Sequence, residues 1–118
     1  MGLLALGVEQ EKTEVLKGTL DMLILKVVAF SPIHGYAISQ RIQQISRDFF
    51  QVPEGSLYPA LYRLEDRGLL QAKWEETETG REAKFYSLTR AGRKRLSAEM
   101  VNWERMSEAV ALILRTVE

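Results

Sequence analysis

Apolar residues in the first half of the chain recur at the spacing of an α-helix in three separate stretches. The first covers residues 19–30, the second 36–45 and the third 55–68. In order, the apolar residues that set this spacing are Leu20, Leu23, Ile24, Val27 and Val28; Ile38, Ile42 and Ile45; and Leu57, Leu61 and Leu64. Pro32 ends the first stretch, because the residue before a proline is driven out of the α region. The pattern predicts three short helices in succession, each with one apolar face turned to a common core.

The pattern then changes to one typical of β-strands. Residues 69–75 and 83–88 are rich in aromatic and apolar side chains, and the polar stretch 76–82 between them contains a glycine. Gly68 stands where a left-handed residue would end the third helix. We therefore expect a β-hairpin directly after that helix, and a tight turn at residues 33–35 between the first two helices.

The last thirty residues predict one long helix with an apolar seam. Thr89 is a suitable N-cap for a helix that starts at Arg90. The seam alternates spacings of four and three through Leu96, Met100, Trp103, Ser107, Val110, Leu114 and Val117. Such a heptad pattern needs a covering partner, and the simplest one is the same helix of a second copy. The apolar members of the seam (Leu96, Met100, Trp103, Val110, Leu114 and Val117) are therefore the expected dimer interface.

Three helices followed by a hairpin form the layout of a winged helix-turn-helix. The expected fold class is thus mainly α (α+β), with a two-stranded β-wing and a C-terminal dimerisation helix. Residues 1–15 form a flexible or partly helical arm, residues 16–88 the winged helix-turn-helix domain, and residues 89–118 the dimerisation helix. In this fold the third helix enters the major groove of DNA and the wing touches the flanking backbone.

Composition favours a cytoplasmic protein but does not identify its binding partner. The 118 residues include 16 basic and 16 acidic side chains, and this neutral balance argues against a non-specific polyanion binder. Basic residues nevertheless outnumber acidic ones from Ser56 to Arg95. The absence of cysteine excludes disulfide scaffolds and thiolate sites, and fits the cytoplasm. No segment approaches the roughly 18 apolar residues of a membrane span, so no membrane association is expected.

The outward face of the third predicted helix carries the candidate DNA-binding groups. Ser56 and the free N–H groups of the opening turn can take a phosphate. Tyr58 and Tyr62 offer hydroxyls and flat faces, and Arg63 can reach a phosphate or a guanine edge. The full candidate set, with two basic residues of the hairpin, is Tyr36, Gly55, Ser56, Tyr58, Pro59, Tyr62, Arg63, Arg81 and Lys84. Pro59 falls in the first turn if the helix begins near Ser56, and produces a small kink if it begins at Glu54.

Simpler interpretations of the same residues remain open. The tyrosines and Arg63 would also suit a helix that covers a core or a partner surface. Arg81 and Lys84 would also suit a solvated hairpin tip. Trp103 can be an anchor of the dimer seam or a platform for a ligand. Specific DNA contacts therefore do not follow from these residue types alone.

Catalysis and metal binding have little support in the sequence. His34 is the only histidine, so no histidine cluster or catalytic dyad can form within one chain. The adjacent carboxylate pairs Glu65-Asp66 and Glu75-Glu76 do not face a common point on a helix or strand. We therefore expect no enzyme activity, no cofactor and no metal site, and we interpret His34 as a turn residue.

Four ordered motifs lie between Leu16 and Gly92. They are KGTLDMLIL at Lys17 to Leu25, HGY at His34 to Tyr36, EGSLYPALYRLE at Glu54 to Glu65, and KFYSLT at Lys84 to Thr89 followed by Ala91 and Gly92. Together they resemble the PadR family of bacterial transcriptional regulators. The resemblance implies a homodimeric repressor that binds a palindromic operator and responds to phenolic acids, drugs or envelope stress. The short tail is similar to that of the short-tailed subgroup. In some drug-binding members a tryptophan of the last helix lines a pore at the dimer interface, and Trp103 occupies a comparable place.

Three hypotheses of function follow. The first is a cytoplasmic, homodimeric, sequence-specific DNA-binding regulator that represses adjacent genes. The second is a sensor in which planar aromatic molecules stack on Trp103 at the dimer interface. The third is a winged-helix module that binds proteins and no longer binds DNA, which the neutral net charge favours.

Overall fold

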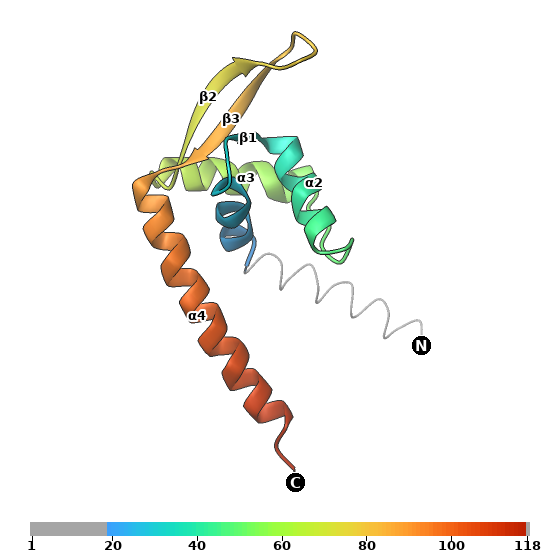
Figure 1. The fold of residues 1–118 in the computed structure, drawn as a ribbon, viewed down its shortest axis with the longest axis vertical. Helices are drawn as coiled ribbons and strands as arrows, with labels where there is room; N and C mark the ends of the chain where they lie inside the picture. Colours follow the sequence, from blue (N-terminus) through green and yellow to red (C-terminus); the bar gives the residue numbers. More distant parts are fainter. Residues whose placement is uncertain (1–18, 118) are drawn as a thin grey trace.

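The computed structural model describes residues 19–117, and its elements follow the predicted order. Residues 19–28 are helical. They are followed by β1 (Ile33–His34), α2 (Gly35–Ile45), α3 (Glu54–Asp66), β2 (Leu70–Glu76), β3 (Glu82–Leu88) and α4 (Arg90–Leu114), as Figure 1 shows. This arrangement confirms the winged helix-turn-helix fold. The arm predicted for residues 1–15 lies outside the described residues.

The sheet contains one strand more than the sequence predicted. β1 pairs antiparallel with β3, with Ile33 opposite Tyr86 and His34 opposite Phe85, so the sheet has three strands in the order β1-β3-β2. The two-stranded hairpin predicted for the wing is confirmed as β2 and β3, whereas the tight turn predicted at residues 33–35 was wrong, because residues 33 and 34 form a strand and α2 begins at Gly35. A strand of two residues is too short to show an alternating pattern, and it forms here because it pairs with the outer edge of β3.

The core lies between the helices and the base of the sheet. The leucine face predicted for α3 is confirmed, because Leu57, Leu61 and Leu64 are each at most 1% exposed. They pack with buried residues of the first helix, α2 and the sheet, among them Ile24, Ile38 and Tyr86. Burial of each leucine contributes about 1.5–3 kcal/mol, so α3 is held firmly by one face. Its other face is left to solvent.

Two short motifs join α3 to the elements that follow. Gly68 has a φ of +71°. The Leu69 N–H donates to Leu64 O at 3.0 Å, and the Gly68 N–H donates to Glu65 O at 2.9 Å. These bonds form a Schellman motif, which confirms the predicted left-handed cap. The predicted N-cap of α4 is confirmed too, since Thr89 Oγ1 accepts from the Gly92 N–H at 2.9 Å and donates to Gly68 O at 2.6 Å.

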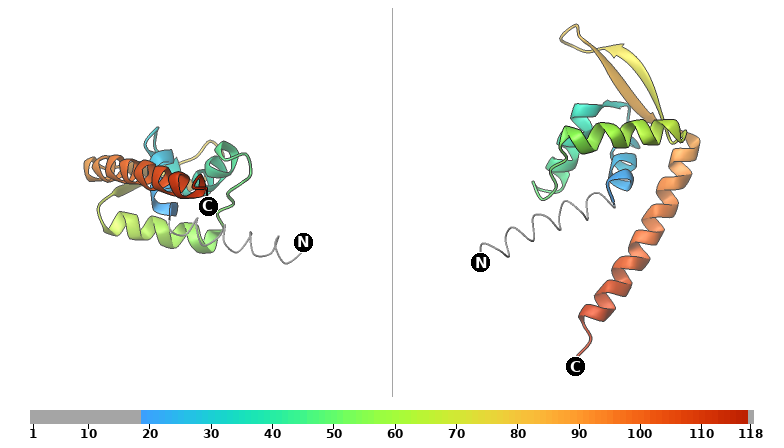
Figure 2. Two further views of the ribbon diagram at one scale, coloured as in Figure 1. Left: turned by 90° about the horizontal axis from the view of Figure 1, so that it is seen from below. Right: turned by 180° about the vertical axis from the view of Figure 1, so that it is seen from behind.

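The hairpin and α4 leave the helical body in opposite directions, as Figures 1 and 2 show. Only Gly92 and Leu96 are buried within α4. Leu96 is 7% exposed and belongs to the core of its own chain, so it is not available to a second copy as predicted. The exposed part of the seam thus starts at Met100, and Val117 lies beyond the end of the helix.

Candidate nucleic-acid interface

The outer face of α3 exposes most of the residues proposed from sequence. Gly55, Ser56, Pro59, Tyr62 and Arg63 are all exposed, and Tyr62 retains 54% of its surface. Because α3 begins at Glu54, Pro59 lies inside the helix and beyond the first turn.

Tyr58 differs from its neighbours because it is half-buried and packs against the core. Its ring lies so close to the start of α2 that a Cβ at Gly35 would approach Tyr58 Cε1 to 2.9 Å. The interpretation of a tyrosine that packs inward therefore applies to Tyr58. Tyr36, the second residue of α2, is exposed beside it.

The N-terminal end of α3 is open to an anion. Its N-cap residue, Pro53, makes no side-chain cap. A Cβ added at Gly55 would meet no atom of another part of the chain within 4 Å, so the space beside Gly55 is open. Helix N-termini attract phosphate through their unpaired N–H groups and the helix dipole. The Ser56 N–H already donates to Pro53 O at 3.0 Å, and Glu54 lies in the same turn, so a phosphate here would meet the backbone at Gly55 and the Ser56 hydroxyl.

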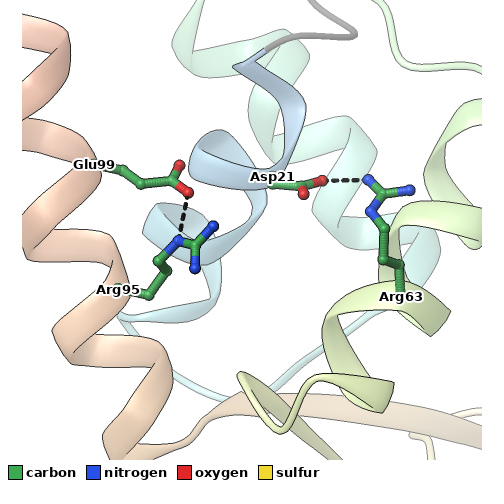
Figure 3. Close-up of polar contacts among 4 residues, drawn as sticks. All are labelled: Asp21, Arg63, Arg95 and Glu99. Atoms are coloured by element: carbon green, nitrogen blue, oxygen red, sulfur yellow. Dashed lines mark hydrogen bonds and ion pairs between the residues drawn. The ribbon is translucent and has the colours of Figure 1, made fainter.

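Arg63 is paired within the protein. Its Nη2 donates to Asp21 Oδ1 of the first helix at 2.5 Å, and Figure 3 shows the two side chains extending toward each other between the helices. Both partners remain partly exposed. Arg63 can therefore reach a phosphate or a base only by leaving Asp21. This pairing was not predictable from local sequence patterns, because the two residues are 42 positions apart.

Lys84 is also paired, and it lies away from the hairpin tip. Its Nζ donates to Glu65 Oε1 of α3 at 2.9 Å and lies 5.5 Å from the centres of the Tyr62 and Tyr86 rings. The hydrogen bond to Glu65 raises the pKa of Lys84 above its ordinary value, against the opposing effect of burial. Lys84 is only partly exposed, so the interpretation of a solvated tip residue does not apply to it.

The hairpin tip is acidic. Arg81 is exposed there, but residues 76–82 also include Glu76, Glu78 and Glu82. Glu76 lies directly opposite Glu82 in the strand register. The tip thus carries three carboxylates and one guanidinium, and Coulomb repulsion opposes its approach to a phosphate backbone. Sequence reasoning named the basic residues of the hairpin and missed this balance.

An aromatic groove joins the start of α2, the outer face of α3 and the hairpin. It has a volume of about 330 Å³, and aromatic side chains dominate its lining. Its lining includes Tyr36, Tyr58, Tyr62, Trp74, Lys84 and Tyr86. Flat faces and hydroxyls together suit contact with sugars and phosphates. Trp74 was missed from the sequence, although the register places it directly opposite Lys84.

A second cavity of about 480 Å³ lies between the first helix and α4. Trp103, Met106 and Asn102 of α4 line it together with Thr19 and Met22 of the first helix. At its rim, Arg95 Nε donates to Glu99 Oε1 at 2.9 Å, on the side of the first helix opposite Arg63, as Figure 3 shows. Trp103 thus lines a cavity within one chain.

Comparison with known proteins assigns the family. The pattern described as "Transcriptional regulator PadR-like family" matches residues 24–98. A transcriptional regulator of Mycobacterium tuberculosis is 34% identical over 87 residues, which are 74% of this chain and 78% of that relative. The chain belongs to the PadR-like family of transcriptional regulators. PadR-like proteins are transcriptional regulators and not enzymes, so the expectations of family and of no enzyme activity are confirmed.

Solved structures of PadR-like proteins share the fold over nearly the whole chain. A PadR family regulator from Eggerthella lenta superposes with a TM-score of 0.83 at 26% identity, covering 99% of this chain and 100% of that one. A PadR-like regulator from Bacillus cereus gives a TM-score of 0.77 at 28% identity, covering 88% and 99%. In residues 19–117 of this PadR-like chain, no helix is long and apolar enough to cross a membrane.

Proposed function

We propose that this PadR-like regulator acts as a homodimer that binds a palindromic operator and represses adjacent genes. The observation that carries the proposal is the outer face of α3. The face is exposed from Gly55 to Arg63, begins at an uncapped helix N-terminus, and is held in place by three buried leucines. The major groove admits one α-helix, and a rigidly anchored helix can present its side chains to base edges there.

The contacts have different expected roles. The first turn of α3 at Gly55 and Ser56 takes a backbone phosphate. Tyr62, with Tyr36 beside the aromatic groove, contacts sugars and phosphates through its ring and hydroxyl. Arg63 reaches the DNA by exchanging the Asp21 carboxylate for a phosphate or a guanine edge. Arg81 is the cation that remains exposed at the wing tip.

The second copy is supported by the apolar surface of α4. Met100, Trp103, Val110 and Leu114 are exposed at heptad spacing along a helix that extends past the body. A second α4 packed on this face would remove them from water. The two α3 helices would then reach successive major grooves, about 34–36 Å apart. Because the chain is neutral overall, two copies of the interface are needed for useful affinity.

Binding to the protein's own upstream DNA tests the proposal. Fluorescence anisotropy should show tighter binding to that duplex than to an unrelated duplex of equal length, with affinity that falls as salt rises. A reporter gene under the same upstream region should be less active when the protein is present. Equal affinity for both duplexes would contradict sequence-specific binding. No binding to either duplex would favour a winged-helix module that binds proteins.

A second function, small-molecule sensing, is supported by the cavity beside Trp103. We expect planar aromatic compounds to quench Trp103 fluorescence. Trp74 is exposed on the hairpin and would obscure the signal, so the titration belongs in a Trp74→Phe background. Quenching that also changes operator affinity supports an effector site. No quenching across a broad panel of planar compounds argues against it.

A further inference from the structure

An ion pair joins the hairpin of the wing to α3, between Lys84 on β3 and Glu65 in the last turn of α3. We propose that these two residues form a clamp that fixes the orientation of the wing relative to α3, and that Lys84 is a positioning residue for operator recognition and not a phosphate ligand. The inference deepens the proposed DNA binding and rests on it.

The environment of the pair supports a structural bond between two elements. The Nζ to Oε1 distance is 2.9 Å, and the Lys84 and Glu65 side chains are 28% and 33% exposed. Solvent screens such a pair less than a fully exposed one. The hairpin also contains a second ion pair, which is more exposed and lies within a single strand. Lys73 and Glu75, both on β2, lie 3.5 Å apart and are 80% and 50% exposed, and they join no separate elements.

The Lys84 ammonium has partners on both elements. Tyr62 of α3 and Tyr86 of β3 each place a ring centre 5.5 Å from Nζ. A cation over an aromatic face gains electrostatic attraction in addition to its hydrogen bond. If Lys84 turned outward to a phosphate, it would lose the carboxylate and both rings at once. The ammonium is therefore engaged within the protein.

β1 pairs with β3 at Tyr86 and Phe85, and the part of the hairpin beyond Phe85 has little buried surface to fix its direction. Within β2 only Leu70, at the base, is buried, and within β3 only Tyr86 and Leu88 are buried. The outer half of the hairpin is thus a two-stranded ribbon, and such ribbons are marginally stable and twist readily. Lys84 lies where the ribbon leaves the body. A hydrogen bond to α3 at this point restricts the movement of the outer half of the hairpin relative to α3.

The test compares Lys84→Met, Glu65→Gln and the double variant, with Lys73→Met and Glu75→Gln as controls that make the same charge changes on the wing. Affinity for the upstream duplex and for an unrelated duplex is measured across a salt series. The ratio of the two affinities cancels the general effect of changing one charge.

The clamp predicts that each single variant lowers the affinity ratio by about three- to tenfold, and that the double variant lowers it no further than the more severe single one. The controls should leave the ratio unchanged, and Lys84→Arg should retain most of it. The salt slope, which is the change in log affinity with log salt concentration, should be the same for Lys84→Met as for the unaltered protein. A slope reduced by about 0.9, with a Glu65→Gln variant that binds more tightly and keeps its ratio, would overturn the proposal in favour of a phosphate ligand.

Hydrogen–deuterium exchange without DNA separates this inference from the proposed function. Lys84→Met and Glu65→Gln should accelerate exchange in residues 70–88 relative to the helical core, and the control variants should not. Unchanged exchange in the hairpin would overturn the clamp even if operator binding is found. Failure of the unaltered protein to prefer its upstream DNA would overturn the proposed function, and the exchange data would still decide the clamp.

Discussion

Arg63 of α3 donates a hydrogen bond to Asp21 of the first helix, at 2.5 Å between Nη2 and Oδ1. The best candidate for reading a base in the DNA-free protein is therefore held by a carboxylate. Figure 3 shows the first helix between this pair and α4, where Arg95 and Glu99 are paired on its other side. Because the Arg63 pair is partly exposed, it contributes little to stability, at most about 1 kcal/mol. Its effect on DNA binding is expected to be larger.

Asp21→Asn should increase affinity for any duplex, because it releases the Arg63 guanidinium and removes a negative charge near the DNA. The salt slope should steepen by about 0.9 if the freed guanidinium neutralises one phosphate. Anisotropy titrations across a salt series measure both quantities. Glu99→Gln is the matched control, since it removes a similar carboxylate partner on α4, and it should leave both unchanged. Weaker binding by Asp21→Asn would indicate that Asp21 orients Arg63 and does not compete for it.

Gly55→Ala should raise the stability of the protein and weaken its binding to the operator. The position is helical and open, so alanine should stabilise the protein by about 0.5–1 kcal/mol. The added methyl group would project into the space proposed for a phosphate and should weaken operator binding several-fold. Thermal unfolding and anisotropy measure the two effects. A variant that is stabilised and still binds as tightly would place the phosphate elsewhere.

Gly92→Ala should have the opposite effect on stability. A Cβ at this position would lie 2.1 Å from Leu69 O and 2.7 Å from Leu88 Cδ1, so the first turn of α4 would have to move off the body. Overpacking of this kind costs about 1–3 kcal/mol. Denaturant unfolding measures the loss, with Gly55→Ala as the matched substitution in open space. An unchanged midpoint would mean that α4 is not packed closely on residue 69.

Val110→Glu should dissociate the proposed dimer, because it places a carboxylate in the apolar seam of α4, where a charge would be buried without a partner. Sedimentation velocity should show monomers, and operator affinity should fall with the loss of the second half-site contact. Arg105→Gln makes the same change in net charge five residues away, on another face of the helix, and should remain dimeric. A monomeric unaltered protein would remove the basis for this prediction.

Stability should decline in strongly alkaline solution. The pKa of Lys84 is raised above its ordinary value of 10.5 by Glu65, and burial raises the pKa of Tyr86 above 10.0. Raised pKa values in the folded state mean that the folded protein retains these protons more strongly than the unfolded chain. The resulting stabilisation is complete below the ordinary pKa values and is lost as pH rises through the raised ones.

Unfolding midpoints measured from pH 9 to about 12 should therefore fall above pH 10. Lys84→Met and Tyr86→Phe should each flatten the profile. Lys73→Met, which alters an exposed lysine on β2, should leave its shape unchanged. A profile that Lys84→Met leaves as steep as before would contradict the assigned cause.

The sequence predicted most of the elements because their signals are local. Leucines at helical spacing defined the buried face of α3, Gly68 marked its end, and Thr89 marked the start of α4. The strand β1 escaped prediction because two residues have no period, and its existence depends on an edge of β3 more than fifty positions away. Leu96 fits the seam by spacing, yet the fold packs it into the core.

In the candidate interface, too, some features follow from local sequence and others only from the tertiary structure. The sequence by itself determined the family, the anchored face of α3 and the kinds of side chain on its outer face, because these follow from periodicity and from motifs within short stretches. Only the tertiary structure decided which basic side chains are paired with carboxylates of the same chain. Asp21 neutralises Arg63 and Glu65 neutralises Lys84 across gaps of 42 and 19 residues. Ion pairing depends on distances of a few ångströms in space, which only the packing of the first helix, α3 and β3 against one another sets.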